Sequence, residues 1–151
     1  MQKQLTIFFL LNHFYFTGIA QTDTSFKPLK KIKGDIVAFA ADNFDNIYLL
    51  NSYDQLKKIN EKGDSVAVFN NIRKYGKVAQ IDVSNPLRVL LYYKDFSTIV
   101  ILDRLLSIRG TIDLRKQDIF QVQAICLSYD NKIWLYDEFD HKLKKIGRAH
   151  V

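Results

Sequence analysis

The sequence predicts an all-β protein built from a repeated antiparallel unit. Short apolar runs rich in Val, Ile, Tyr and Phe alternate with clusters of Asn, Asp and Gly, which is the pattern of strands joined by hairpins. The pattern returns about every 43 residues along the chain. No stretch has the apolar spacing of a long amphipathic helix. Together these three observations favour antiparallel sheets that follow one another along the chain.

The repeat is visible in the residues themselves. Phe-Asp-Asn-Ile-Tyr-Leu-Leu at 44–50 matches Tyr-Asp-Asn-Lys-Ile-Trp-Leu-Tyr at 129–136, and a Leu-Lys-Lys-Ile segment follows each. A weaker copy at 85–102 has Asn85-Pro86 where the others have Asp-Asn. A unit of this length lies in the range of four-stranded β-propeller blades.

Each complete unit divides into four expected strands, and the third unit stops after three. The first unit has strands at 36–41, 47–51, 55–60 and 65–69. The second unit has strands at 78–83, 88–93, 98–103 and 107–114. The third has strands at 122–127, 132–137 and 142–146. We therefore predict a β-propeller fragment of about three blades in an open arc, with a lead-in at 21–34 and blades at 35–77, 78–121 and 122–146.

The pattern Asp-Asn-x-Ile-Trp-Leu-x-Asp, followed by x-Leu-Lys-Lys-Ile, resembles NHL-type and related six-bladed β-propeller repeats over residues 35–146. Residues 92–99 and 112–115 also resemble exported, uncharacterised propeller proteins of Bacteroidota. The second copy departs from the repeat at Pro86-Leu87. The resemblance implies a β-propeller fold and does not indicate a particular activity.

Residues 1–20 have the layout of a signal peptide. A lysine precedes an apolar stretch, and the small residues Gly18 and Ala20 stand at the −3 and −1 positions, so we expect cleavage between Ala20 and Gln21. Asn12-His13 interrupts the apolar stretch, which is too short for a membrane-spanning helix. We expect an exported protein that is periplasmic, displayed on the cell surface or secreted.

Residues 146–151 resemble the translation of a common sequencing adapter. A terminal segment that is not part of the natural protein is excluded when the fold is inferred from the sequence. We therefore expect the natural protein to continue beyond this point and the present chain to be a C-terminally truncated fragment.

Composition excludes several classes of protein. Hydrophobic residues make up 48% of the 151 residues, which excludes a disordered chain. The net charge of +6 is spread along the sequence, which favours a solvated surface over nucleic-acid binding. Cys126 is the single cysteine and lies in an apolar run, so we expect it to be buried. No spacing of His and Cys indicates a metal site, and no motif indicates a cofactor.

The candidate binding residues lie in loops. Propellers usually bind ligands on the face formed by the loops between second and third strands and by the connections between blades. All three of these hairpin loops pair an aromatic residue with a carboxylate, a combination that suits a sugar ring or a protein partner. The alternative is that the aromatics cap the blade edges while the Asp residues form ordinary turns. The candidates are Tyr53, Asp54, Arg73, Tyr75, Lys94, Asp95, Phe96, Glu138, Phe139 and Asp140.

We expect an exported binding or scaffold module whose loop face recognises a protein or glycan partner, and no catalytic residue is assigned. One alternative is a glycan hydrolase or lyase in which Asp54, Asp95 and Asp140 converge as general acid and base. Another is the sensor propeller of a longer envelope receptor. The sequence contains no Ser/His/Asp set, P-loop or dinucleotide fingerprint.

Overall fold

The computed structural model describes residues 26–147. The expected signal peptide, with its cleavage site between Ala20 and Gln21, lies outside the described residues, as do the last four residues of the adapter-like segment. Contacts divide the chain into the units Met1–Ile32 and Lys33–Val151, and the helices and strands of the described residues all belong to the second unit. No helix in the described part of the chain is both long and apolar enough to span a membrane.

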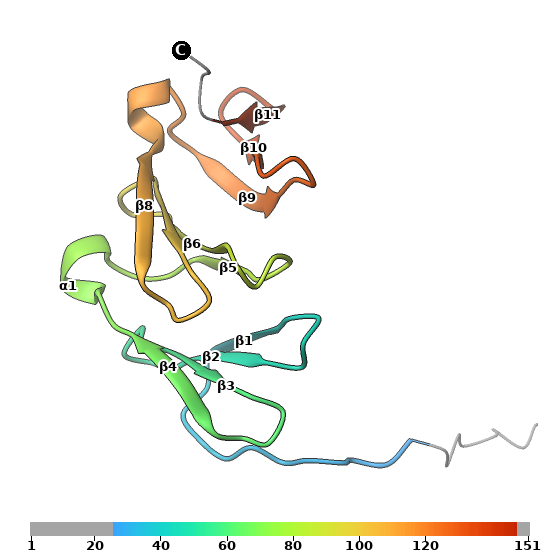
Figure 1. Ribbon diagram of the computed structural model, residues 1–151. Helices are drawn as coiled ribbons and strands as arrows, with labels where there is room; N and C mark the ends of the chain where they lie inside the picture. The colour runs from blue at the N-terminus through green and yellow to red at the C-terminus, as the bar shows by residue number, and fades with distance from the viewer. Residues whose placement is uncertain (1–25, 148–151) are drawn as a thin grey trace, which may run out of the picture. The chain divides into compact units, whose positions relative to one another are not determined.

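Three antiparallel sheets follow one another along the chain, which confirms the all-β propeller fragment with an incomplete third blade (Figure 1). The first sheet contains β1 (Ala38–Ala41), β2 (Ile47–Leu50), β3 (Leu56–Ile59) and β4 (Ser65–Phe69). The second contains β5 (Gln80–Asp82), β6 (Val89–Tyr93), β7 (Thr98–Leu102) and β8 (Ile108–Asp113). The third contains β9 (Val122–Leu127), β10 (Ile133–Asp137) and β11 (Lys142–Ile146).

Each sheet is a meander in which sequence neighbours pair through hairpins. The turn between the second and third strands has one residue with a left-handed backbone in every sheet: Asp54, Ser97 and His141, with φ of 54°, 46° and 53°. Asp tolerates this conformation better than most residues because its side chain can bond to the nearby backbone. The repeated turn geometry keeps the three hairpins equivalent.

The core depends on the middle sheet, which is buried on both faces. Val89, Leu91 and Tyr93 of β6 belong to a cluster with the first sheet, whereas Leu90 and Tyr92 belong to a cluster with the third sheet. Successive strand side chains point to opposite faces, so the all-apolar run of β6 supplies both clusters. All five β6 side chains are at most 1% exposed.

The outward faces of the first and third sheets are also apolar but exposed. Phe39 and Val68 in the first sheet are 74% and 51% exposed, and Leu143 in the third sheet is 71% exposed. Cys126, which was expected to be buried, is exposed as well, so that expectation was wrong. Its neighbour Ile125 takes the inward position in β9, which leaves Cys126 on the outward face.

Two short helical segments occur where only loops were expected. The helix α1 (Ile72–Tyr75) connects the first and second sheets, and the 3₁₀-helix η1 (Leu114–Gln117) connects the second and third. Each is a single turn, too short to produce a periodic apolar pattern in the sequence. Asp113 caps η1, because its side chain accepts a hydrogen bond from the backbone N–H of Arg115.

A buried polar network lies beside the apolar cluster between the first and second sheets. The Asp42 carboxylate accepts hydrogen bonds from the backbone N–H groups of Phe44 and Asn46, the Asn46 amide and the Tyr48 hydroxyl. The Lys58 ammonium lies 4.0 Å from Asp42 Oδ2. Burial alone would raise the pKa of Asp42, but the hydrogen bonds, that from Asn46 foremost, lower the pKa overall.

The lowered pKa of Asp42 predicts a specific loss of stability in acid. The folded protein binds a proton at Asp42 less readily than the unfolded chain does, so this contribution is present above the unfolded-state pKa and disappears as the pH falls through the folded-state value. We expect Asp42→Asn to lower the free energy of unfolding at pH 7, with the difference from wild type shrinking towards pH 3. Urea unfolding of both proteins at pH 7, 5 and 3 measures this. A difference that stays constant with pH would contradict the assignment.

Candidate functional site

Five segments meet to form the surface that we call the loop face. They are the hairpin turns 51–55, 94–97 and 138–141 and the connections 70–79 and 114–121. Hydrogen bonds and one close ring contact link each segment to the next, so the surface is continuous.

The first turn is fixed to the connection that follows it. Asp54 Oδ1 accepts a hydrogen bond of 3.0 Å from the backbone N–H of Val78. Asn51 Oδ1 accepts hydrogen bonds from the backbone N–H groups of Tyr53 and Gln55, which stabilises the turn from within. The Tyr53 side chain is left 74% exposed. The carboxylate therefore holds the loop while the aromatic ring faces solvent.

The second turn contacts both connections. The Phe96 ring lies against Gly76, whose φ is 78°; a Cβ at position 76 would be 3.2 Å from Phe96 Cε2. On the other side, Ser97 Oγ donates to the Phe120 carbonyl at 3.2 Å, and the backbone N–H of Leu114 donates to the Ser97 carbonyl at 2.9 Å. Phe96 is 45% exposed.

The third turn is hydrogen-bonded to the preceding connection, and an ion-pair network links its Asp140 to the flanking strands. The backbone N–H of Glu138 donates to the Gln121 carbonyl at 2.7 Å. The Lys144 ammonium lies 2.7 Å from Asp137 Oδ2 and 2.5 Å from Asp140 Oδ2. The hydrogen bond from Lys144 lowers the pKa of Asp140, and the bonds to Asp137 and Asp140 raise the pKa of Lys144. Phe139 is 69% exposed at the tip.

Tyr75 occupies a different environment from the other candidates. It is 6% exposed and belongs to the cluster between the first and second sheets, with its ring centroid 5.3 Å from that of Tyr93. Burial raises the pKa of Tyr93. Tyr75 thus supports the loop face from beneath. Arg73 lies in α1, outside the residues whose side chains the structure describes.

The remaining candidates are solvent-accessible. Lys94, Asp95 and Glu138 are exposed, and Asp54 and Asp140 are half-buried. The carboxylates proposed as converging acids have separate partners: Asp54 bonds to Val78, whereas Asp140 pairs with Lys144. Within residues 26–147, no group of three or more His, Cys, Asp or Glu side chains could hold a metal ion.

The sequence analysis missed two features. Phe120, in the second connection, is 54% exposed on the loop face, and its sequence neighbour Ile119 is buried. An Ile-Phe pair in a loop does not reveal which of the two is buried. The second feature is a hollow of about 510 Å³ at the opposite end of the sheets, with the exposed Phe44 and Tyr129 at its rim. Phe44 and Tyr129 occupy matching positions of the sequence repeat. The sequence analysis interpreted both positions as turns between strands and not as part of a hollow.

Comparisons with known proteins support the fold. No protein-family profile matches the chain, and no curated protein matches it. A catalytically inactive virginiamycin B lyase from Staphylococcus aureus, solved with quinupristin, is similar at 12% identity and a TM-score of 0.53, over 72% of this chain and 36% of that one. A streptogramin B lyase structure gives 14% identity and a TM-score of 0.53, over 73% of this chain and 39% of that one. The chain thus spans less than half the length of either protein.

These two structures are β-propeller enzymes, so the likeness establishes propeller blades as the architecture of this chain. At 12% and 14% identity the likeness extends to the fold and not to the chemistry. The assignment to NHL-type repeats gains no support from the profile comparison and stays a prediction.

The close approach of Phe96 to Gly76 predicts that a larger residue at position 76 destabilises the protein. We expect Gly76→Ala to destabilise the protein by about 1–2 kcal/mol, because Ala is strained at this positive φ and its Cβ would crowd the Phe96 ring. Gly110→Ala is the matched control, since a Cβ at position 110 meets nothing within 4 Å. We expect it to change stability by less than about 0.5 kcal/mol. Urea unfolding measures both, and equal effects would contradict this view of the second turn.

Proposed function

We propose that the chain is part of an exported β-propeller whose loop face binds a glycan or protein partner. One observation carries this proposal: each of the three equivalent turns presents an exposed aromatic side chain from a backbone that hydrogen bonds hold in place. The rings are Tyr53, Phe96 and Phe139. A rigid turn lowers the entropy lost when a ring is immobilised by a partner, and aromatic residues dominate binding energy at many interfaces.

The charges beside these rings favour an anionic partner. Lys94 lies in the second turn, Lys74 and Lys77 in the first connection, and Lys116 in the second, all with exposed side chains. The guanidinium of Arg115 is engaged by Asp113 within the protein. Asp54 and Asp140 already bond within the protein, which leaves Asp95, Asp118 and Glu138 as the exposed carboxylates of this surface beside the four exposed lysines. An acidic glycan or an acidic protein surface fits this combination of aromatic rings and cations.

The proposal is tested on an array of neutral and acidic glycans, with the full chain as the probe. We expect binding that is strongest for acidic glycans and weakens at least about tenfold for Tyr53→Ala, Phe96→Ala or Phe139→Ala, because each ring supplies contact area of hot-spot type. Phe44→Ala is the matched control, an equally exposed aromatic in a different set of turns. Loss of acidic-glycan binding through Phe44→Ala alone would contradict the proposal, because it would place the binding site at the hollow that Phe44 and Tyr129 line.

A propeller lyase is the second candidate, and its support is the fold shared with the two lyases. Incubation of the protein with quinupristin, followed by chromatography, separates the two functions. Unchanged quinupristin is the outcome that binding without chemistry predicts, whereas conversion would favour the lyase. A role as the sensor of a longer envelope receptor would use the same loop face.

A further inference from the structure

The hollow at the end of the sheets opposite the loop face is a second surface that could hold a ligand. Its volume of about 510 Å³ lies within the range of about 300–1,000 Å³ that is usual for small-molecule sites. The turns between the first and second strands of all three sheets line it. Their side chains include Asn43 and Phe44 from the first turn, Ser84 and Asn85 from the second, and Tyr129 and Asn131 from the third.

The lining of this hollow is aromatic, apolar or polar without charge. Among the described residues, no Asp, Glu, Lys, Arg or His lines it. The Phe44 ring is 66% exposed and the Tyr129 ring is fully exposed, so both can contact a ligand. The side-chain amides of Asn43 and Asn131 and the hydroxyl of Ser84 have no hydrogen-bond partner within residues 26–147. These groups can therefore bond to a ligand without breaking a bond inside the protein.

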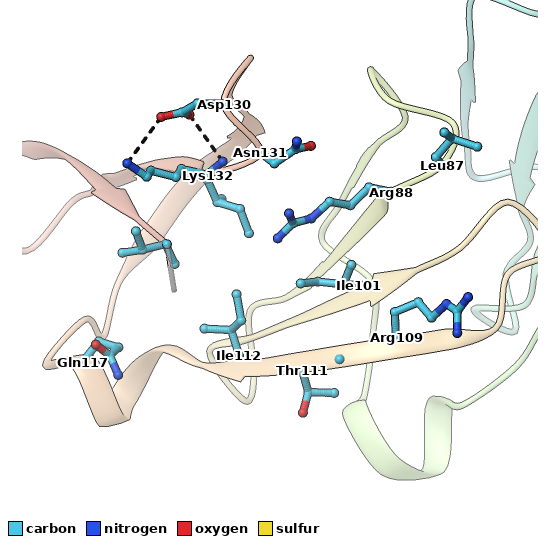
Figure 2. A pocket seen from close by; sticks show the side chains of 14 residues that line it. Leu87, Arg88, Ile101, Arg109, Thr111, Ile112, Gln117, Asp130, Asn131 and Lys132 are labelled. Carbon is cyan, nitrogen blue, oxygen red and sulfur yellow. Dashed lines mark hydrogen bonds and ion pairs between the residues drawn. The ribbon is translucent and has the colours of Figure 1, made fainter. Parts of the chain in front are cut away.

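A larger hollow next to it has a charged lining. Its volume is about 660 Å³, and it shares Leu87 and Asn131 with the smaller one (Figure 2). Figure 2 shows the Asp130 carboxylate paired with Lys132 at its edge, with 3.5 Å between Asp130 Oδ2 and the Lys132 ammonium. The carboxylate beside Tyr129 in the third turn thus belongs to the larger hollow. Asp45, which follows Phe44 in the first turn, lines neither hollow.

Hydrogen bonds hold the turns around the smaller hollow in place. In the first turn, Asp42 Oδ1 accepts a hydrogen bond of 2.9 Å from the backbone N–H of Phe44. Between the second and third sheets, the Asp82 carboxylate accepts hydrogen bonds from the backbone N–H groups of Ser84 at 2.9 Å and Leu127 at 2.5 Å. Ser84 and Leu127 both line the hollow, so one carboxylate fixes the distance between two of its walls. A lining that is fixed in advance reduces the entropy lost on binding.

We infer that this hollow binds an uncharged glycan and is a site separate from the loop face. Amide and hydroxyl groups both donate and accept hydrogen bonds, as the hydroxyl groups of a sugar do. The face of an aromatic ring is electron-rich and attracts the C–H groups of a sugar ring. Phe44 and Tyr129 thus stack on the sugar, while Asn43 and Asn131 bond to its hydroxyl groups. The loop face favours anionic partners through its exposed lysines, so the two ends of the sheets select ligands of different charge.

The test titrates the full chain, labelled with ¹⁵N, with the neutral hexasaccharides cellohexaose, laminarihexaose, mannohexaose and chitohexaose. We expect at least one of them to shift the amide signals of 43–44, 84–85 and 127–131 and to leave those of the loop face unchanged. Phe44→Ala and Tyr129→Ala should each raise the dissociation constant at least about tenfold. Phe44→Tyr keeps an aromatic ring and should retain most of the affinity. Tyr53→Ala, which removes a 74% exposed ring from the loop face, is the matched control and should have no effect.

Three results would overturn the inference. One is that none of these sugars shifts the signals of the three turns. Another is that an uncharged Gly-Ser hexapeptide shifts them as strongly as the sugars do, since the hollow would then be a peptide site. The third is equal weakening by Tyr53→Ala and Phe44→Ala, which would place the neutral glycan elsewhere. Each result leaves the loop-face proposal to its own test, because that test measures the binding of acidic glycans.

Discussion

Burial of the middle sheet on both faces is the constraint on which the rest of the structure depends. A single strand, β6, supplies the centre of two clusters, and its side chains are at most 1% exposed. Each large apolar side chain buried there contributes on the order of 1.5–3 kcal/mol relative to an exposed one. The short strands of the first and third sheets, only four to six residues each, gain their stability by packing against this sheet.

The loop face follows from this packing. Because β6 fixes both neighbouring sheets, the three equivalent turns come to the same end of the sheets, where the two connections can bond to them. Asp54 joins Val78, Ser97 joins Phe120, and Glu138 joins Gln121. The bonding groups face the protein and the aromatic rings face solvent, which is an arrangement suited to recognition.

The fold could be predicted from the sequence because strand periodicity, turn residues and the repeat all indicate the same architecture. The eleven strands of the described residues lie within the expected runs, and the differences are of one or two residues at the ends. The burial of Tyr75 and the exposure of Cys126 could not be predicted, because both depend on which side of the chain meets a neighbouring sheet. The partners of Asp54 and Asp140 are equally hidden in the sequence, since an Asp in a turn can bond to its own loop, to a neighbouring segment or to a ligand.

Nuclear Overhauser contacts between methyl groups test the central claim most directly. The account predicts that the Leu91 methyls show contacts with side chains of β2 and β3, and that the Leu90 methyls show contacts with side chains of β9 and β10. Contacts from both leucines to the same neighbouring strands would contradict it, because β6 would then not separate two sheets.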